Sequence, residues 1–324
     1  MTLTRRTVLA GLAATAATPA FAQSGSGQGW TPNRPITVIH GFPPGGSVDS
    51  ITRLVAESLS SRLGQGVVVE ARPGAGGTLA ASQVVRSAPD GYTLLSVPSG
   101  HAVSAAMYKK LPYQAVDDFS FITTTTDYPL VLVTYADHPA RSMADFLKLG
   151  REQELLGGGP NGTLQHLSME LLARTAKLKV KLVPYRGSPQ ALTDMLGKRI
   201  DFMLDPPAAH LEPIKDGRLR ALAVTGTSRF FALPDVPTMA EAGVPDFAVS
   251  SWQGLMGPAG LPGPIADRIA KETAAVLSDA AVVEKLKLLG NEAKASTPDA
   301  FKARVVSDIE KWNQVVAAAN IERI

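Results

Sequence analysis

Short apolar runs alternate with stretches of helical periodicity along most of the chain. The run ITVIH at residues 36–40 is followed by apolar residues at helical spacing over 51–63. VVVE at 67–70 and YTLLSV at 92–97 are each followed by a further helical pattern. Continuous apolar strands that alternate with helices predict an α/β protein with mainly parallel sheets covered on both faces.

A break in this alternation lies at residues 111–139. Two strand-like runs follow each other there without a helix between them, which we interpret as the crossing from one domain into a second. The Pro-rich segment 233–245 is interpreted as the return. We therefore expect one domain from residues 36–127 and 232–324 and another from 128–231. After the crossing, helical patterns lie at about 141–149, 164–176, 189–196, 208–215, 263–279, 281–289 and 298–319.

The first 22 residues have the features of an export signal. TRRTVLAGLAATAATPAFAQ combines Arg5 and Arg6 with a short apolar stretch and a small-residue cleavage motif. An arginine pair is typical of the twin-arginine route. We expect a twin-arginine-type signal peptide over residues 1–22, a flexible leader over 23–35 and a periplasmic location.

Composition narrows the function classes further. The 324 residues carry a net charge of +3, which falls to +1 once Arg5 and Arg6 leave with the signal. A nearly neutral chain gives no electrostatic basis for binding nucleic acid or an anionic membrane. The chain has no cysteine, which excludes disulfides, thiolate metal sites and a cysteine nucleophile. We expect no cofactor, no metal and a monomer.

Glycine-containing turns between a strand and a helix recur along the chain. They are GFPPGGSVDS at 41–50, RPGAGGTLAA at 72–81, VPSGHAV at 97–103, GGGPNGTLQH at 157–166 and PYRGSPQAL at 184–192. Glycine allows a ligand to approach the backbone closely, and a helix N-terminus offers free N–H groups and partial positive charge to an anion. The first turn has no Lys, Arg or His, so an anion there would be held by backbone donors. Such loops gather at the carboxyl edge of an open α/β sheet.

None of these turns matches a nucleotide-binding motif, because the first lacks the P-loop lysine and the second lacks the G-x-G-x-x-G spacing. His166 and Glu170 have the i, i+4 spacing of a metal pair, but an ordinary helix-face pair is the simpler interpretation. Asp205 follows an apolar run and is interpreted either as an acceptor for a ligand or as a helix cap. Asp49 is interpreted as a favourable partner of the helix dipole.

Several long segments together resemble one known family. GPNGTLQHLSMELL, VPYRGSPQALTDMLGKRIDFMLD and LPDVPTMAEAGVPDFAVSSWQGLMGPAGLP, together with the segment that spans the first two glycine turns, are similar to the substrate-binding family of tripartite tricarboxylate transporters, the Bug-type receptors. The resemblance covers essentially the whole chain after the expected signal. It implies a type II-like periplasmic binding protein of two α/β domains joined by crossing strands. Such a receptor captures a small organic carboxylate for a permease with one large and one small subunit.

The resemblance also implies where the ligand binds. Carried over by position, the ligand-binding residues are Phe42, Pro44, Gly45, Gly46, Ser47, Gly76, Gly77, Thr78, Ser99, Gly100, His101, Asn161, Thr163, His166 and Asp205. We expect the ligand carboxylate on the backbone amides of the turns at 44–47 and 76–78, and no catalysis. Three alternatives remain at this point: a receptor for an ATP-driven importer, a secreted serine hydrolase using Ser99 or Ser47 with His101 or His166, and a ligand sensor for a membrane kinase.

Overall fold

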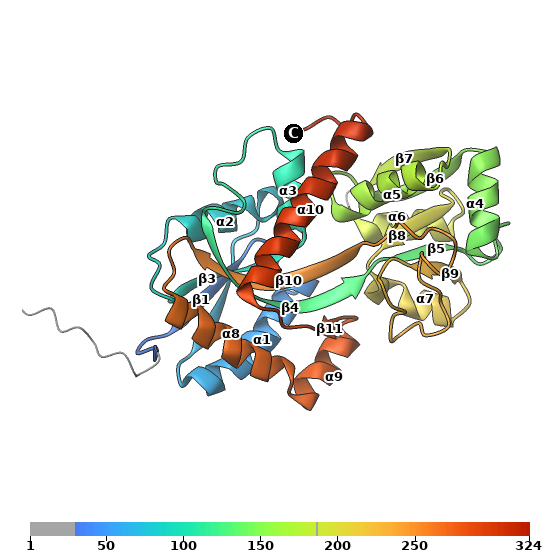
Figure 1. Cartoon of the computed structure of the whole chain (residues 1–324). Helices are drawn as coiled ribbons and strands as arrows, with labels where there is room; N and C mark the ends of the chain where they lie inside the picture. Colours follow the sequence, from blue (N-terminus) through green and yellow to red (C-terminus); the bar gives the residue numbers. More distant parts are fainter. Residues whose placement is uncertain (1–29, 186) are drawn as a thin grey trace, which may run out of the picture.

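The computed structural model describes residues 30–185 and 187–324. The expected signal peptide, the first part of the expected leader and Arg186 lie outside the described residues. The described chain forms two lobes that lie side by side, each built on one sheet (Figure 1). Two long strands pass from one lobe toward the other.

The first sheet has six strands in the described part of the chain, in the order β11-β4-β10-β3-β1-β2. Their bounds are β1 Ile36–His40, β2 Val67–Ala71, β3 Thr93–Pro98, β4 Phe119–Pro129, β10 Ser250–Pro258 and β11 Glu292–Ala293. β1 pairs in parallel with β2 and β3, whereas β10 runs antiparallel to β3 and β4.

The second sheet has five strands in the described part of the chain, in the order β7-β6-β8-β5-β9. Their bounds are β5 Val131–Tyr135, β6 Leu155–Pro160, β7 Val180–Tyr185, β8 Phe202–Asp205 and β9 Leu219–Val224. β6 pairs in parallel with β7 and β8, whereas β5 runs antiparallel to β8 and β9.

The expected class, two α/β domains joined by crossing strands, is confirmed, but each sheet is mixed rather than mainly parallel. The parallel strands are those separated by helices, because a parallel neighbour requires a crossover connection. The antiparallel pairs are β10 with β3 and β4 and β11 with β4 in the first sheet, and β5 with β8 and β9 in the second. The chain leaves the first sheet along β4, enters the second at β5, and returns from β9 to β10. The antiparallel pairing of β5 and β10 therefore follows from the crossing between the sheets.

Helices cover both faces of the first sheet. Their bounds are α1 Ser47–Leu63, α2 Thr78–Val85, α3 Gly100–Met107, α8 Gly263–Leu277, α9 Ala280–Leu288 and α10 Pro298–Ala318, with a 3₁₀ turn η1 at Ala75–Gly77. Buried side chains of α1, α8 and α9 form one apolar cluster against the sheet, and those of α2 and α10 form a second on the other face. α3 packs beside α10.

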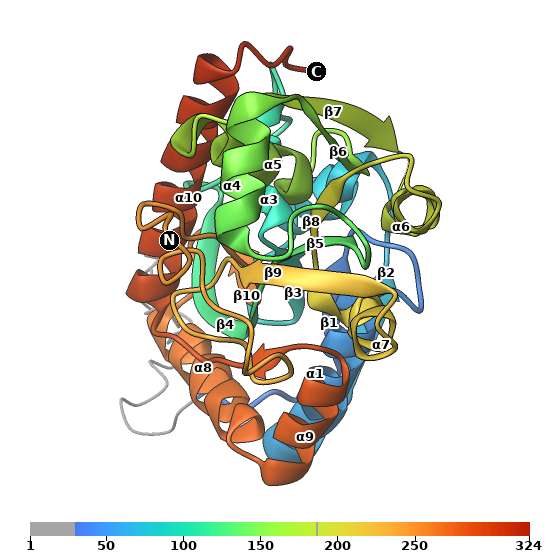
Figure 2. The same ribbon diagram turned by 90° about the vertical axis from the view of Figure 1, so that its right-hand side faces the viewer.

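Helices also cover both faces of the second sheet (Figure 2). Their bounds are α4 Met143–Glu152, α5 Leu164–Thr175, α6 Ser188–Leu196 and α7 Leu211–Lys215, with a 3₁₀ turn η2 at Pro207–Ala209. α4 and α5 lie on one face, where Phe146 contacts Phe202, and α6 and α7 lie on the other. The apolar cluster of α4 and α5 continues into α3 and α10 of the first domain.

The chain leaves the first sheet along β4 and enters the second at β5 after Leu130 alone. On the return, Thr238 forms a bridge with Val224 at the end of β9, and Phe247 and Val249 are buried in the cluster of the second sheet. The chain joins the first sheet again at Ser250 in β10. The domain limits given above stay a prediction.

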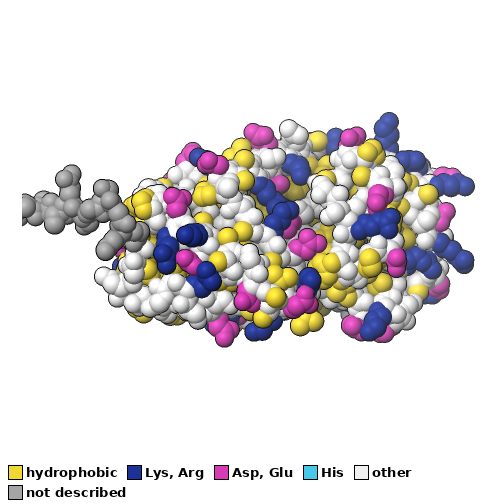
Figure 3. Space-filling view, turned by 60° about the horizontal axis from the view of Figure 1, so that its bottom comes forward, with side chains coloured by type: hydrophobic (Ala, Val, Ile, Leu, Met, Phe, Trp, Pro, Cys, Tyr) yellow, Lys and Arg dark blue, Asp and Glu magenta, His cyan; other side chains and the backbone are white. Residues whose placement is uncertain are grey.

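No helix within residues 30–185 and 187–324 is long and apolar enough to cross a membrane. On the face shown in Figure 3, acidic and basic side chains are interspersed over the described surface. This mixed face agrees with the small net charge of the sequence.

Candidate functional site

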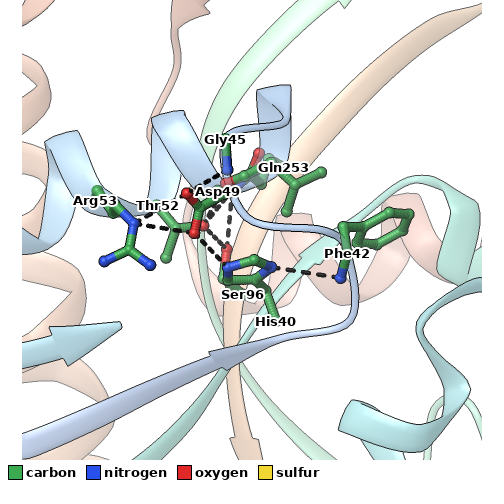
Figure 4. A network of polar contacts seen from close by, with 9 residues as sticks. His40, Phe42, Gly45, Asp49, Thr52, Arg53, Ser96 and Gln253 are labelled. Carbon is green, nitrogen blue, oxygen red and sulfur yellow. Dashed lines mark hydrogen bonds and ion pairs between the residues drawn. The ribbon is translucent and has the colours of Figure 1, made fainter. Parts of the chain in front are cut away.

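The loop that follows β1 is fixed by side chains at both of its ends (Figure 4). His40, the last residue of β1, is fully buried, and its Nε2 lies 2.8 Å from Oδ1 of Asp49 in the first turn of α1. Asp49 also accepts the N–H of Gly45 at 2.9 Å and the Nε–H of Arg53 at 2.9 and 3.0 Å. One carboxylate therefore closes the loop between the strand and the helix.

The charge of Asp49 is compensated inside this network. Hydrogen bonds from Arg53 first, and then from Gly45 and His40, together lower the pKa of Asp49 to about 2 against the opposing effect of burial. The N-terminus of α1 therefore keeps its partial positive charge although an acidic residue lies in its first turn.

Only some N–H groups of this turn are available to a ligand. Gly45 donates to the carboxylate, and Gly46 donates to the carbonyl of Pro43 at 3.4 Å. The N–H groups of Ser47 and Val48 have no hydrogen-bond partner among the described residues, and no side chain caps α1. These two groups are the orphan donors of the helix start.

The second glycine turn lies directly against the first. A Cβ on Gly41 would lie 2.2 Å from the Cα of Gly77, and one on Gly77 would lie 3.3 Å from the ring of Phe42. Gly76 and Gly77 have φ angles of 65° and 95°, which favour glycine. Thr78 begins α2 and is buried. The two loops touch because neither glycine has a side chain.

The third turn completes a small pocket, which Phe42, Gly76, Gly77 and His101 help to line. His101 is buried, and burial lowers its pKa. Its Nε2 lies 2.8 Å from the carbonyl of Ala115, to which it donates. The imidazole is therefore fixed by the protein itself at one edge of the pocket.

Ser99 precedes α3 and Gly100 is the first residue of that helix. The hydroxyl of Ser99 is 2.7 Å from that of Ser251 in β10. This pair ties the third turn to the strand by which the chain returns to the first sheet. The loops at 41–47, 74–78 and 98–101 are called the first loop group below.

In the second domain, Asn161, Thr163 and His166 lie around the start of α5. Asn161 is exposed. The hydroxyl of Thr163 donates to the carbonyl of Pro160 at 2.6 Å and accepts the N–H of His166 at 3.5 Å, so it caps the helix. Nδ1 of His166 accepts the N–H of Gly162 at 3.1 Å, and burial lowers the pKa of this imidazole.

Asp205, at the end of β8, is 2% exposed and joins the two neighbouring helix starts. Its Oδ1 accepts from Ser188 Oγ at 2.7 Å and from Gln165 Nε2 at 3.3 Å. Its Oδ2 lies 3.7 Å from Nε2 of His210. Burial raises the pKa of Asp205, and the charge of His210 opposes this effect. The loops at 160–166, 187–188 and 205–208 are called the second loop group.

The two loop groups come from different sheets and approach each other near α3. A Cβ on Gly162 would lie 3.8 Å from Cε of Met107 at the end of α3. The first group shares one pocket, whereas the second is linked mainly by the contacts of Asp205. The ligand roles of these residues stay predictions.

Tyr128 is a candidate that the sequence reasoning missed. It lies in β4 just before the chain enters the second sheet. Burial raises the pKa of its phenol, the hydrogen bond with Ser251 opposes this, and the carboxylates of Asp205 and Asp127 raise it further. Tyr128 thus neighbours Ser251, which bonds Ser99 of the first loop group, and Asp205 of the second. The sequence could have indicated Tyr128 by its position in the first crossing strand, because the two domains meet at that strand.

The described residues contain no cluster of three or more His, Asp or Glu that could hold a metal ion. Nε2 of His166 lies 4.0 Å from Glu170, an ordinary pair on one helix face. No hydrogen bond joins Ser47 or Ser99 to a histidine within the described chain. The described geometry therefore contains neither a metal centre nor the serine–histidine pair that a hydrolase requires.

The chain is similar to known receptors over most of its length. The family model described as "Tripartite tricarboxylate transporter family receptor" matches residues 51–321. BugT of Bordetella pertussis is 35% identical over 290 residues, which cover 88% of this chain and 89% of BugT.

Two solved structures are similar in both sequence and fold. MatC of Rhodopseudomonas palustris with bound malate is 30% identical with a TM-score of 0.72, covering 88% of this chain and 99% of MatC. Rpa4515 of R. palustris with adipate is 31% identical with a TM-score of 0.77, covering 90% and 99%. The matched family is a family of receptors and not of enzymes, so the expectation of a non-catalytic chain is confirmed and the hydrolase alternative is wrong. The chain belongs to the tripartite tricarboxylate transporter receptor family, among the Bug-type periplasmic binding proteins.

Proposed function

We propose that the chain binds a small organic carboxylate between its two loop groups. The observation that carries this proposal is the start of α1, where the N–H groups of Ser47 and Val48 are unpaired and Arg53 compensates the nearby acidic charge. Hydrogen bonds to a charged group contribute about 1.5 to 3 kcal/mol each. Two such bonds and the helix dipole hold a carboxylate without a basic side chain.

The relatives support this ligand class. MatC holds malate and Rpa4515 holds adipate, and both ligands are small carboxylic acids. The second loop group has neutral polar side chains around the acceptor Asp205: Ser188 and Gln165 donate to its carboxylate, and Thr163 donates to the carbonyl of Pro160. The size and polarity of this group would select among acids, because the backbone donors of the first group recognise any carboxylate.

A thermal-shift screen tests the ligand class. The chain without residues 1–22 is heated with malate, adipate, longer di- and tricarboxylates, aromatic acids and acidic amino acids, with the corresponding amides as controls. A ligand at about 100 times its Kd stabilises a protein by about 2.7 kcal/mol, so a binding acid raises Tm clearly and its amide does not. If no acid raises Tm, the proposal fails.

We further propose that the receptor is a periplasmic monomer that delivers its ligand to a permease of one large and one small subunit. Closure of two domains over a ligand presents a surface that the open form lacks. Co-purification of such a permease from solubilised membranes, dependent on the acid found in the screen, supports this partner. Ligand-dependent capture of a membrane kinase instead would overturn it.

The periplasmic location rests on the arginine pair of the expected signal. Replacement of both Arg5 and Arg6 by Lys keeps the charge but changes the pair that the twin-arginine route reads. We expect the precursor of this variant to accumulate in the cytoplasm while the unchanged chain appears in the periplasmic fraction. Equal export of the two chains would contradict the twin-arginine assignment.

A further inference from the structure

The two domains touch on both sides of the crossing strands. On one side, Arg174 of α5 donates to the carbonyl of Ala318 at the end of α10 at 2.5 Å, within a continuous apolar cluster. On the other side, the turn that follows α9 meets η2 of the second domain. A Cβ on Gly290 would lie 3.2 Å from Cβ of Ala208 and 3.5 Å from its Cα. The three atoms nearest to that position all belong to Ala208, and of these only the Cβ is a side-chain atom, so the spacing is set by one methyl group and the two backbones.

The position of Gly290 is fixed to the first sheet. Its N–H donates to the carbonyl of Lys287 at 2.8 Å, and the N–H of Asn291 donates to that of Leu286 at 2.9 Å, which closes the end of α9. β11 follows at once and pairs with β4 at Asp127. Gly290 has a φ of 72°, so the turn favours glycine both for its backbone and for the space beside it.

The position of Ala208 is fixed to the second loop group. It lies in η2, three residues after Asp205. The N–H of His210 donates to the carbonyl of Pro207 at 2.8 Å, and Nδ1 of His210 donates to that of Pro206 at 3.1 Å. A displacement of η2 therefore also moves the end of β8, where Asp205 holds the starts of α5 and α6.

We propose that the contact between Gly290 and Ala208 is a stop between the domains, which sets how closely the second loop group approaches the first. Position 290 then determines ligand affinity without touching the ligand. This inference rests on the proposed function, since it concerns closure around the same ligand. A side chain at position 290 meets Ala208 before the loop groups reach their ligand-binding separation.

Gly290→Asn is the variant that tests this stop. Asn adopts positive φ more readily than most other non-glycine residues, so most of its effect arises from the added bulk against Ala208. Gly260→Asn is the matched control, because Gly260 has a φ of 79° and nothing within 4 Å of its Cβ position. Adding Ala208→Gly to Gly290→Asn removes the methyl group in the contact and tests the pair directly.

Affinity for the acid found by thermal shift is the first readout. A binding-competent population reduced to about a tenth weakens the apparent affinity about tenfold. We expect a loss of this order in Gly290→Asn, no change in Gly260→Asn and partial recovery in the double variant. Equal affinity of Gly290→Asn and the unchanged chain, or an equal loss in Gly260→Asn, would overturn the inference.

A distance measurement provides a readout that needs no ligand. Because the chain lacks cysteine, spin labels can be placed at Val68→Cys in the first domain and Gln190→Cys in the second, both at exposed positions. We expect a longer distance between labels in Gly290→Asn than in the unchanged chain and in Gly260→Asn. If no acid binds the unchanged chain, the proposed function fails, while identical distances in all three chains reject the stop independently.

Discussion

His40 and Asp49 join the end of β1 to the first turn of α1 through a hydrogen bond of 2.8 Å. The backbone N–H of Phe42 points to Nδ1 of His40 at 3.4 Å, so Nδ1 accepts and Nε2 carries the proton that it donates to Asp49. The imidazole thus holds both the loop backbone and the carboxylate. The buried side chains of His40 and Asp49 hold the loop in place, and the N–H groups of Ser47 and Val48 stay unpaired.

Asp49→Asn should lower the free energy of unfolding at neutral pH and make it less dependent on pH in the acid range. The pKa of Asp49 lies at about 2 in the folded chain against 3.8 unfolded, so its contribution is present above pH 4 and is lost as pH falls toward about 2. Because Arg53 is half exposed, we expect a contribution of about 1 to 2 kcal/mol at pH 7. Urea unfolding between pH 7 and pH 2.5 measures this difference.

The control for this variant is Asp246→Asn, at an exposed position outside the network. Its unfolding midpoint should follow that of the unchanged chain at every pH. A difference between the Asp49 variant and the unchanged chain that stayed constant from pH 7 to pH 2.5 would show that the carboxylate has no depressed pKa.

Gly41→Ala should destabilise the chain and abolish ligand binding. The added Cβ would lie 2.2 Å from the Cα of Gly77, so the backbones of the two turns must separate. Overpacking of this kind costs about 1 to 3 kcal/mol. Gly66→Ala is the control, because nothing lies within 4 Å of its Cβ position and its φ is not positive. If the Gly41 variant bound the acid with unchanged affinity, the close approach of Gly41 and Gly77 would not be required for ligand binding.

The sequence predicted most helices closely but missed β6. The patterns at 263–279, 281–289 and 298–319 lie within two residues of α8, α9 and α10. The glycines at 157–159 were interpreted as part of a turn, yet they form half of β6. A Cβ on Gly157 would lie 2.7 Å from the ring of Phe202, and one on Gly158 would lie 2.3 Å from Ile200. The glycines of β6 leave space for the large side chains of Phe202 and Ile200, which come from another segment. The residues of β6 alone therefore do not indicate a strand.

The sequence predicted which loops form the candidate site, but not which backbone N–H groups in them are free. The glycine pattern indicated the loops, and three of them do share a pocket. The sequence could not show that Asp49 occupies the N–H of Gly45, since this depends on the buried position of His40. Pro44 has no N–H to offer in any arrangement. Every residue except proline has the same backbone N–H group, so only the folded structure shows which of these groups lack a hydrogen-bond partner.

Asp205→Asn should leave stability at pH 7 unchanged or raise it. Burial raises the pKa of Asp205, so its charged form is disfavoured in the fold, and the cost appears as pH rises above the unfolded pKa. Asn keeps one oxygen for Ser188 and carries no charge. The Tm of the variant should equal or exceed that of the unchanged chain at pH 7, and any excess should shrink below pH 4.

Asp201→Asn is the contrasting variant. Burial acts to raise the pKa of Asp201, but hydrogen bonds from His138 and from the N–H of Leu156 outweigh it, so its pKa is lowered. Its charged form stabilises the fold above pH 4, and the variant should have a lower Tm at pH 7. If both variants shifted Tm in the same direction, the opposite effects of burial and hydrogen bonding at these two carboxylates would be refuted.

Ser47→Pro isolates the backbone donor on which the proposed function depends. Ser47 is the first residue of α1, where proline is well tolerated. The preceding Gly46 has φ −75° and ψ 172°, the extended conformation that a residue before proline prefers. The variant therefore keeps the helix and removes one N–H group. Ser47→Ala is the control, because it removes the hydroxyl and keeps the N–H.

Loss of one hydrogen bond to a carboxylate of about 1.5 to 3 kcal/mol weakens binding by about 10- to 150-fold. We expect a loss of this size in Ser47→Pro, measured by calorimetry with the acid from the thermal-shift screen, and a Tm without ligand close to that of the unchanged chain. Ser47→Ala should bind within about threefold of the unchanged chain, because it keeps the backbone N–H that the proposal places on the carboxylate. Undiminished binding by the proline variant would show that the N–H of residue 47 does not hold the carboxylate, because Ser47→Pro removes this group and Ser47→Ala keeps it.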